Sequence, residues 1–325
     1  MHLLTQCDFQ TTHRSFIMID ILMAVYNGEK YLAQQIDSIL VQSEPGWHLY
    51  INDDCSSDTS YDIAVKYAKE HPEKITVSRN GRPSGSACAN FMGMLGRTDA
   101  EYAMFCDQDD VWLPHKIKLT LQKMKELEKS YGNTPMLVHT ELSVTDSELN
   151  VTAPSFTRFQ GLNPRYNSLN RLLCQNNVTG CTVMINRALI ELVKNAHADN
   201  MLMHDWWLAL AAAAFGHIGF VAEPLIKYRQ HGNNQLGAVN NRSLKGIAHF
   251  IARSSEAKQR INATYRQAEC FYSSYKAILP AESKAIVEAY MDIPSHSKLS
   301  RTARLIKHGF LKQNLMSAAG QLIFC

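Results

Sequence analysis

The stretch "MFCDQDDVWLP", residues 104–114, places three aspartates within four positions directly after an apolar run. Carboxylates this close repel one another, and burying them is unfavourable unless a cation shares them. A helix cap is the plain alternative, but a cap uses one aspartate rather than three. Because carboxylates favour hard divalent ions, the stretch predicts a site for Mg²⁺ or Mn²⁺.

Strand-like and helix-like patterns alternate through the first 130 residues. Apolar segments at 19–25, 48–53, 74–80 and 101–108 are expected to be strands, with amphipathic helices between them. After the last of these, Ile117, Leu121 and Met124 recur at helical spacing. The alternation predicts an α/β fold, with a mostly parallel sheet and helices on both of its faces.

Three polar loops follow the expected strands: "AVYNG" at 24–28, "NDD" at 52–54 and "DQDD" at 107–110. Ligands of parallel sheets bind at the carboxyl ends of the strands, so we expect these loops at one edge. After an Asx turn and a helix cap, Asp53 and Asp54 leave one carboxylate that could accept hydrogen bonds from a nucleotide base or ribose. The first loop has neither GxGxxG nor GxxxxGK[ST], which disfavours a dinucleotide fold and a P-loop kinase.

The composition is that of an ordinary folded protein, with 46% hydrophobic and 19% charged residues among 325. The net charge of +3 gives no reason to expect a nucleic-acid partner. Eight cysteines form no CxxC pair and are expected to be free thiols in a reducing compartment, the cytoplasm. No apolar segment has the length of a membrane span, and the N-terminal residues lack the apolar core of a signal peptide.

Several motifs together resemble those of family 2 glycosyltransferases, which have the GT-A fold. They are "AVYNGEKYLAQQIDSIL" at 24–40, "NDDCSSD" at 52–58 and "CDQDDVWLP" at 106–114. Downstream, "NNVTGCTVMINR" at 176–187, "MHDWWLALAAAAFG" at 203–216 and "YRQHGNN" at 228–234 are similar to a bacterial rhamnosyltransferase-like branch. One departure is Cys55, which stands where such sequences usually have Gly, so this turn must close without glycine's conformational freedom.

The resemblance implies roles for the matching residues. It implies that Asp107 and Asp109 hold Mn²⁺ or Mg²⁺ on a nucleotide diphosphate, with His231 as an extra metal or diphosphate ligand. It makes Asp205 the candidate general base, for which a helix N-cap is the rival interpretation. The residues expected at the nucleotide sugar are Ala24, Val25, Tyr26, Asn27, Asp54, Asp107 and Gln108. Those expected to contact the acceptor or sugar are His204, Trp206 and Trp207. For the two tryptophans, packing in the core is the alternative.

The resemblance also divides the chain. Residues 1–17 are expected to be a loose extension, and 18–237 a GT-A catalytic domain with a nucleotide-binding half at 18–130 and an acceptor half at 131–237. Residues 238–325 have few strand signals and many Lys and Arg, which predicts a helical, basic, amphipathic region. This region either packs on the catalytic domain or docks on anionic lipid.

The implied activity is inverting, metal-dependent transfer of L-rhamnose from dTDP-rhamnose to a hydroxyl of a growing bacterial surface polysaccharide, O-antigen or capsule. The metal would neutralise the departing diphosphate while one carboxylate takes the proton of the acceptor hydroxyl. Two alternatives stay open: hexosyl transfer from a UDP-sugar, and a non-catalytic module that binds nucleotide or carbohydrate. The acceptor is expected to be a saccharide, free or lipid-linked, and the protein to be cytoplasmic, either free or peripheral on the inner face of the cell membrane.

Overall fold

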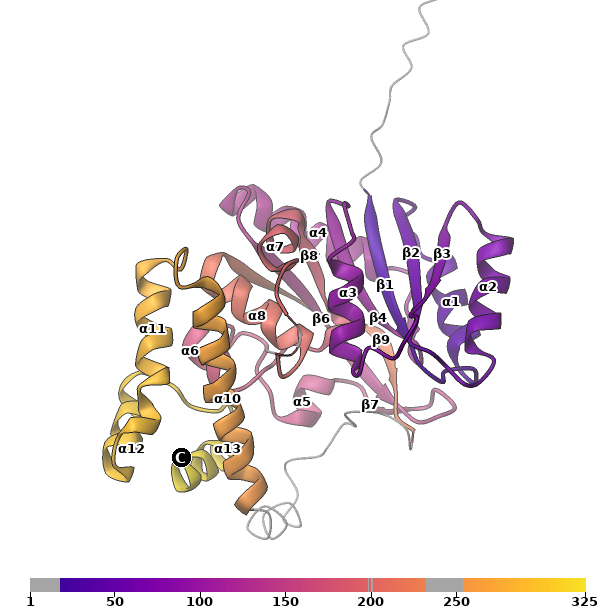
Figure 1. Cartoon of the computed structure of the whole chain (residues 1–325). Helices are drawn as coiled ribbons and strands as arrows, with labels where there is room; N and C mark the ends of the chain where they lie inside the picture. The colour runs from indigo at the N-terminus through magenta and orange to yellow at the C-terminus, as the bar shows by residue number, and fades with distance from the viewer. Residues whose placement is uncertain (1–17, 198, 200, 232–253) are drawn as a thin grey trace, which may run out of the picture.

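One nine-stranded sheet runs through the computed structural model, which describes residues 18–197, 199, 201–231 and 254–325 (Figure 1). The predicted extension at 1–17, and residues 232–253 at the junction of the two larger predicted regions, lie outside the described residues. The strand order is β3-β2-β1-β4-β8-β6-β9-β5, with β7 paired to β6. The strands are β1 (Ile19–Val25), β2 (Trp47–Asp53), β3 (Ile75–Arg79), β4 (Tyr102–Asp107), β5 (Val111–Trp112), β6 (Met136–Thr145), β7 (Val151–Ala153), β8 (Met184–Asn186) and β9 (His217–Arg229).

The first half of the sheet confirms the predicted α/β alternation. β3, β2, β1 and β4 are parallel neighbours. Three helices connect them in chain order, namely α1 (Leu32–Leu40), α2 (Ser60–Glu70) and α3 (Ala87–Leu95), and α4 (Lys116–Tyr131) follows the last strand. The four strands and the helix expected after 114 are therefore all found close to their predicted positions.

The second half of the sheet is mixed rather than parallel. β8 runs antiparallel to both β4 and β6, and β5 runs antiparallel to β9, whereas β6 and β9 are parallel. The chain enters β8 from the 3-10 helix η1 (Gly180–Thr182), which lies against β4, so β8 runs back along β4. The prediction of a mostly parallel sheet thus describes the first half better than the second.

Two hydrophobic layers cover the two faces of the sheet. Ile19, Ile21 and Met23 of β1 pack with residues of α1 and α4, whereas Leu22 belongs to the opposite layer. This alternation follows from the two-residue period of a strand. The opposite layer contains α3, α6 (Leu169–Cys174), α7 (Arg187–Val193) and α8 (His204–Phe215).

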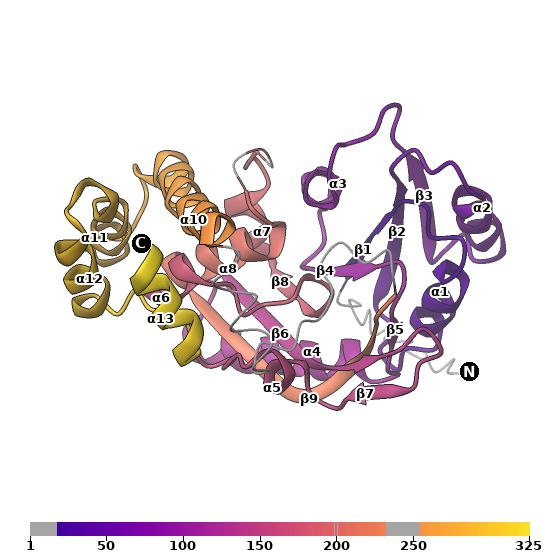
Figure 2. The same ribbon diagram turned by 90° about the horizontal axis from the view of Figure 1, so that it is seen from below.

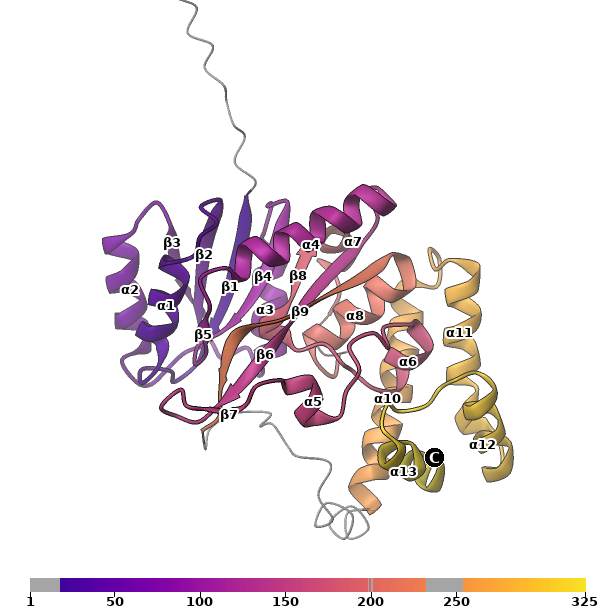
Figure 3. The same cartoon turned by 180° about the vertical axis from the view of Figure 1, so that it is seen from behind.

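The C-terminal helices extend that second layer (Figure 3). They are α10 (Ser254–Tyr275), α11 (Ala281–Met291), α12 (Lys298–Lys307) and α13 (Leu315–Phe324). Phe271, Val287, Leu305 and Phe310 are buried in the same cluster as the apolar residues of α8. The interpretation in which the C-terminal region packs on the rest of the chain is confirmed for these helices. None of the helices in the described residues combines the length and the apolar character needed to cross a bilayer.

Candidate active site

The carboxyl ends of β1, β2 and β4 lie side by side, at the lower edge of the sheet in Figure 1. Val25 pairs with Asp53 across β1 and β2, and Ala24 pairs with Asp107 across β1 and β4. The loops that follow the three strands are therefore neighbours, as the sequence predicts. Figure 2 looks onto this edge from below.

The loop after β1 is held in place by side chains from the other two loops. The amide of Gln108 accepts a hydrogen bond from Tyr26 N at 2.8 Å and donates one to Tyr26 O at 2.9 Å. A Cβ on Gly28 would lie 2.4 Å from Gln108 Cδ, so this approach requires glycine. Asn27 N donates to Ser56 Oγ at 3.0 Å. Gln108 thus fixes the backbone of the loop predicted to border a nucleotide, and its amide is already used by that backbone.

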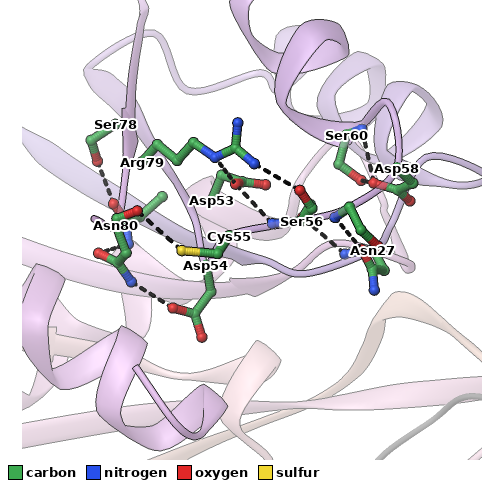
Figure 4. Close-up of polar contacts among 12 residues, drawn as sticks. Asn27, Asp53, Asp54, Cys55, Ser56, Asp58, Ser60, Ser78, Arg79 and Asn80 are labelled. Carbon is green, nitrogen blue, oxygen red and sulfur yellow. Dashed lines mark hydrogen bonds and ion pairs between the residues drawn. The ribbon is translucent and has the colours of Figure 1, made fainter. Parts of the chain in front are cut away.

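The two aspartates after β2 have different partners (Figure 4). Asp53 is buried and pairs with Arg79 Nε at 3.1 Å. Asp54 accepts hydrogen bonds of 2.7 Å from Asn80 Nδ2, from Ser84 N and from Ser84 Oγ. Its carboxylate therefore shapes the loop at 80–84, and its predicted contact with a base stays a prediction.

The loop at 80–84 and helix α3 enclose a cavity of about 480 Å³. Three asparagines that line this cavity are hydrogen-bonded to one another. Asn52 Nδ2 donates to Asn80 Oδ1 at 3.0 Å and to Asn90 Oδ1 at 2.6 Å. Arg82 and Arg97 also line it. This polar cavity adjoins the loop that Asp54 organises.

Cys55 closes the turn after β2 with φ at 63°, in the left-handed region that favours glycine. Its thiol donates to Asn80 O at 3.1 Å. The departure noted in the sequence is therefore accommodated by strain in the backbone, and the turn keeps the shape that a glycine would give it.

The aspartates of the "DQDD" stretch point in different directions. Asp109 Oδ2 lies 2.8 Å from His231 Nε2, and the ring of His231 packs on Tyr31. These residues line a second cavity of about 420 Å³ together with the β1 loop, and the complete lining is Tyr26, Asn27, Gly28, Lys30, Tyr31, Gln108, Asp109 and His231. Five residues predicted to bind donor or metal therefore meet in one cavity.

Asp110 turns inward; it belongs to the predicted acidic stretch, although the family resemblance assigns metal roles only to Asp107 and Asp109 of its three aspartates. Its Oδ1 accepts from Arg229 N at 3.1 Å, while its buried Oδ2 receives no N–H or O–H hydrogen bond from any described residue. Ligand atoms of Asp107, Asp110 and Cys181 lie within 4.8 Å of one another. These carboxylate oxygens fit a divalent cation, and the thiol of Cys181, which also hydrogen-bonds Asp110, is an addition that no sequence pattern indicated.

Burial and mutual repulsion make the ionised forms of these carboxylates unfavourable. Burial, followed by the negative charges of Asp109 and Asp205, raises the pKa of Asp107 to about 7. Burial and the charges of Asp109 and Asp107 raise the pKa of Asp110 well above its ordinary value. A cation would relieve this repulsion. Since the charge of Asp205 acts on Asp107, the candidate base and the acidic cluster face the same part of the site.

Asp205 is the second residue of α8 rather than its cap. The N-cap is Met203, whose side chain makes no capping hydrogen bond, so the rival N-cap interpretation of Asp205 is wrong. Asp205 Oδ1 accepts from Asn176 Nδ2 at 3.1 Å, and the backbone of Gly180 also hydrogen-bonds the carboxylate. Burial nevertheless raises the pKa of Asp205 to about 7. A carboxylate with such a pKa is suited to accept a proton near neutral pH.

The three residues predicted to contact the acceptor differ in their exposure to solvent. Trp207 is fully buried and donates from Nε1 to Tyr275 Oη at 3.2 Å. His204 is buried beside Phe91, and burial lowers its pKa to about 3. Both belong to the hydrophobic layer because α8 is apolar on every face, so neither offers a surface to an acceptor. Trp206 is partly exposed and keeps that predicted role as a candidate.

Asn176, Gly180 and Cys181 are the site residues that sequence reasoning missed. All three belong to the motif at 176–187, which carries a family resemblance but no recognisable chemistry of its own. A Cβ on Gly180 would lie 2.8 Å from His204 Nε2, which explains the glycine. η1 therefore connects the two parts of the site, since Gly180 contacts the Asp205 side and Cys181 the Asp107 side.

Comparison with known proteins identifies relatives of the chain. It is 28% identical over 234 residues to the dTDP-rhamnosyl transferase RfbG of Shigella flexneri, covering 66% of this chain and 74% of the other. It is also 28% identical over 218 residues to the putative teichuronic acid biosynthesis glycosyltransferase TuaG of Bacillus subtilis, covering 67% and 81%.

Among solved structures, TarS of S. aureus, residues 1–349, is similar with a TM-score of 0.53 and 12% sequence identity, covering 94% of this chain and 90% of the other. This likeness confirms the predicted fold class, including the helical C-terminal region. The model of the family described as glycosyl transferase family 2 matches residues 20–192, more than half of the chain. The chain belongs to glycosyl transferase family 2.

Proposed function

We propose that this glycosyltransferase moves L-rhamnose from dTDP-rhamnose to a hydroxyl of a growing bacterial surface polysaccharide, O-antigen or capsule, with inversion at the anomeric carbon. The observation that carries the reaction type is the placement of the buried Asp205 carboxylate next to the acidic cluster at the carboxyl edge of the sheet. The similarity to RfbG supports the choice of donor. The identity of the donor is therefore proposed in addition to the reaction type.

The acidic cluster is the proposed metal and diphosphate site. Asp107 and Asp109 would hold Mn²⁺ or Mg²⁺, with His231 beside Asp109 and with Asp110 and Cys181 behind Asp107. The bound ion would neutralise the charge that grows on the diphosphate as the glycosidic bond breaks. The β1 loop, fixed by Gln108, would border the nucleotide on the other side of the same cavity.

Asp205 is the proposed base. Its carboxylate would accept the proton of the acceptor hydroxyl while the oxygen attacks the anomeric carbon, and a single direct displacement inverts that centre. Its pKa of about 7 matches this task better than that of an exposed aspartate near 4. Trp206, partly exposed on the next position of α8, would contact the acceptor.

The acceptor is proposed to be a saccharide carried on a membrane lipid. The enzyme would then work in the cytoplasm, in peripheral contact with the inner face of the cell membrane through its C-terminal helices. Hexosyl transfer from a UDP-sugar is the alternative donor chemistry, and a binding module without activity is the alternative class.

Donor screening by nucleotide release tests the proposal. The full chain with Mn²⁺ should release dTDP from dTDP-rhamnose faster than UDP from UDP-glucose or UDP-galactose, and Asp205→Asn should suppress acceptor-dependent release. Preference for a UDP-sugar would replace the donor and keep the reaction. Metal-dependent nucleotide binding with no release from any donor, when acceptor is supplied, would favour the binding module.

A further inference from the structure

Helices α12 and α13 each expose an apolar stripe at helical spacing. On α12 the stripe consists of Leu299 and Ile306, with side chains 85% and 56% exposed, and the exposed Ala303 lies between them. On α13 it consists of Leu315, 90% exposed, and Ile323, 62% exposed. Residues four and seven or eight positions apart share one face of a helix, so each stripe is continuous.

These stripes are not the faces on which the helices are anchored. Leu305 of α12 is fully buried, and Phe310, between the two helices, is 1% exposed. Gln321 of α13 is buried and binds the chain between the helices, since its Nε2 donates to Phe310 O at 3.0 Å and its Oε1 accepts from Lys312 N at 2.9 Å. The inner faces therefore hold the helices in place, and the outer faces stay exposed on a fixed support.

The start of α12 lies against the end of α13. Lys298, the first residue of α12, donates from Nζ to the carbonyl oxygen of Ile323 and, at 3.2 Å, to that of Cys325. The exposed Met316, at 41%, widens the stripe of α13. We define the tail surface as Leu299, Ile306, Leu315, Met316 and Ile323.

Basic residues predominate around the tail surface. Residues 293–325 contain five Lys and Arg and no Asp or Glu. Lys307 is exposed beside Ile306, and Lys298 is exposed at the start of α12. Two of the five contribute less, because Arg304 pairs with Asp292 and burial lowers the pKa of Lys312. A second copy of this surface would bring like charges together, whereas an anionic surface would match both the apolar stripes and the positive charge.

Helix α13 lies on the same side of the molecule as the candidate active site. In Figure 1 the carboxyl ends of β1, β2 and β4 point downward, and α13 lies in the lower part of the helical region, beside the lower end of α10. Figure 2, which looks at the molecule from below, shows α13 in front of α11 and α12. An enzyme resting on a flat surface by α13 would therefore turn the carboxyl edge of its sheet toward that surface.

We propose that the tail surface docks on a lipid bilayer that carries anionic headgroups. Apolar side chains enter the headgroup region and the basic residues attract the anionic lipid, which gives reversible attachment. This inference rests on the proposed function for its purpose, because it would bring a lipid-linked acceptor to the site. Its physical basis is independent of the donor and of the reaction.

Vesicle flotation with the full chain tests the docking surface without using donor or turnover. Vesicles of phosphatidylcholine with about one third phosphatidylglycerol should carry the protein upward, whereas vesicles of phosphatidylcholine alone should carry little. Raising the salt concentration should weaken the attachment. Replacing the five residues of the tail surface by Ser should lower the bound fraction on the order of tenfold.

The matched control is Val41→Ser with Val151→Ser, two residues that are 64% and 54% exposed elsewhere. It should float like the wild type, and all variants should keep the melting temperature of the wild type. Equal flotation of the five-residue variant and the wild type would overturn the proposal. So would a tail surface that produces concentration-dependent dimers in light scattering and no vesicle binding. Nucleotide release measured on the same samples separates these outcomes from a failure of the proposed function.

Discussion

The proposed chemistry depends most on Asp205. A general base acts only when deprotonated, and the pKa of this carboxyl is raised to about 7 by burial. With metal and donor saturating, the transfer rate should therefore fall about tenfold per pH unit below pH 7 and reach a plateau above it. Rates of transfer between about pH 5.5 and pH 8.5 measure this limb. Asp205→Asn should lose the limb and slow transfer by at least about a hundredfold, while the exposed Asp62→Asn on α2 should change neither.

Asn176 offers a sharper version of the same test. Its amide donates to the Asp205 carboxylate at 3.1 Å, a bond that favours the charged form. Asn176→Ala should raise the pKa of the base and move the limb to higher pH. A variant that melts earlier but keeps the limb at pH 7 would mean that Asn176 supports the fold without tuning the base.

Cys55 shows how a residue can keep a backbone shape that its side chain disfavours. With φ at 63° the turn would be relaxed by glycine, although Cys55→Gly also loses the hydrogen bond from the thiol to Asn80 O. Cys55→Ala loses the same bond and keeps the strain, so it is the matched control. Denaturant unfolding should place Cys55→Gly above Cys55→Ala by about 1 kcal/mol. The reverse order would show that the turn is not strained in solution.

At the scale of elements, the periodicity of the sequence was sufficient to predict the parallel half of the sheet. The parallel strands β1 to β4 follow from alternating patterns, and their carboxyl ends meet as expected because parallel strands place them on one edge. The antiparallel direction of β8 could not be foreseen, since the pattern of a strand does not say which way it runs beside β4 and β6. The direction of a single side chain was also beyond reach, and Asp109 and Asp110 diverge although they are adjacent.

The C-terminal helices show which alternative holds at this scale. The amphipathic pattern left open whether this region packs on the catalytic domain, and Leu305 and Phe310 are buried in the layer that contains α8. Deletion after residue 295 should therefore expose this layer and give poorly soluble protein or a melting temperature lowered by several degrees, because buried apolar contacts are lost. Deletion after residue 312 removes only α13 and should be milder. Thermal melts of both truncations give the comparison, and equal, wild-type stability would mean that the tail is a separate unit.

At the scale of the whole molecule, η1 joins two regions that the sequence presents separately. The acidic cluster follows β4, and the proposed base begins α8 about a hundred residues later. Gly180 and Cys181 lie between them and contact one region each. The composition of the chain gives no sign of this arrangement, which arises because β8 returns along β4 and carries η1 to the edge of the sheet.

Metal binding should be visible in the stability of the whole chain. A ligand that binds only the folded state raises the free energy of unfolding, by about 2.7 kcal/mol at a hundredfold excess over its Kd. Mn²⁺ should therefore raise the melting temperature, and dTDP should raise it further only when Mn²⁺ is present. Because the pKa of Asp107 is raised to about 7, protons compete with the ion below that pH, so the shift should shrink as the pH falls. Asp109→Asn should reduce the shift strongly and His231→Asn less so, since the carboxylate carries the charge, whereas Asp62→Asn should keep it. An undiminished Mn²⁺ shift in Asp109→Asn would remove Asp109 from the metal site and leave Asp107, Asp110 and Cys181 as its ligands.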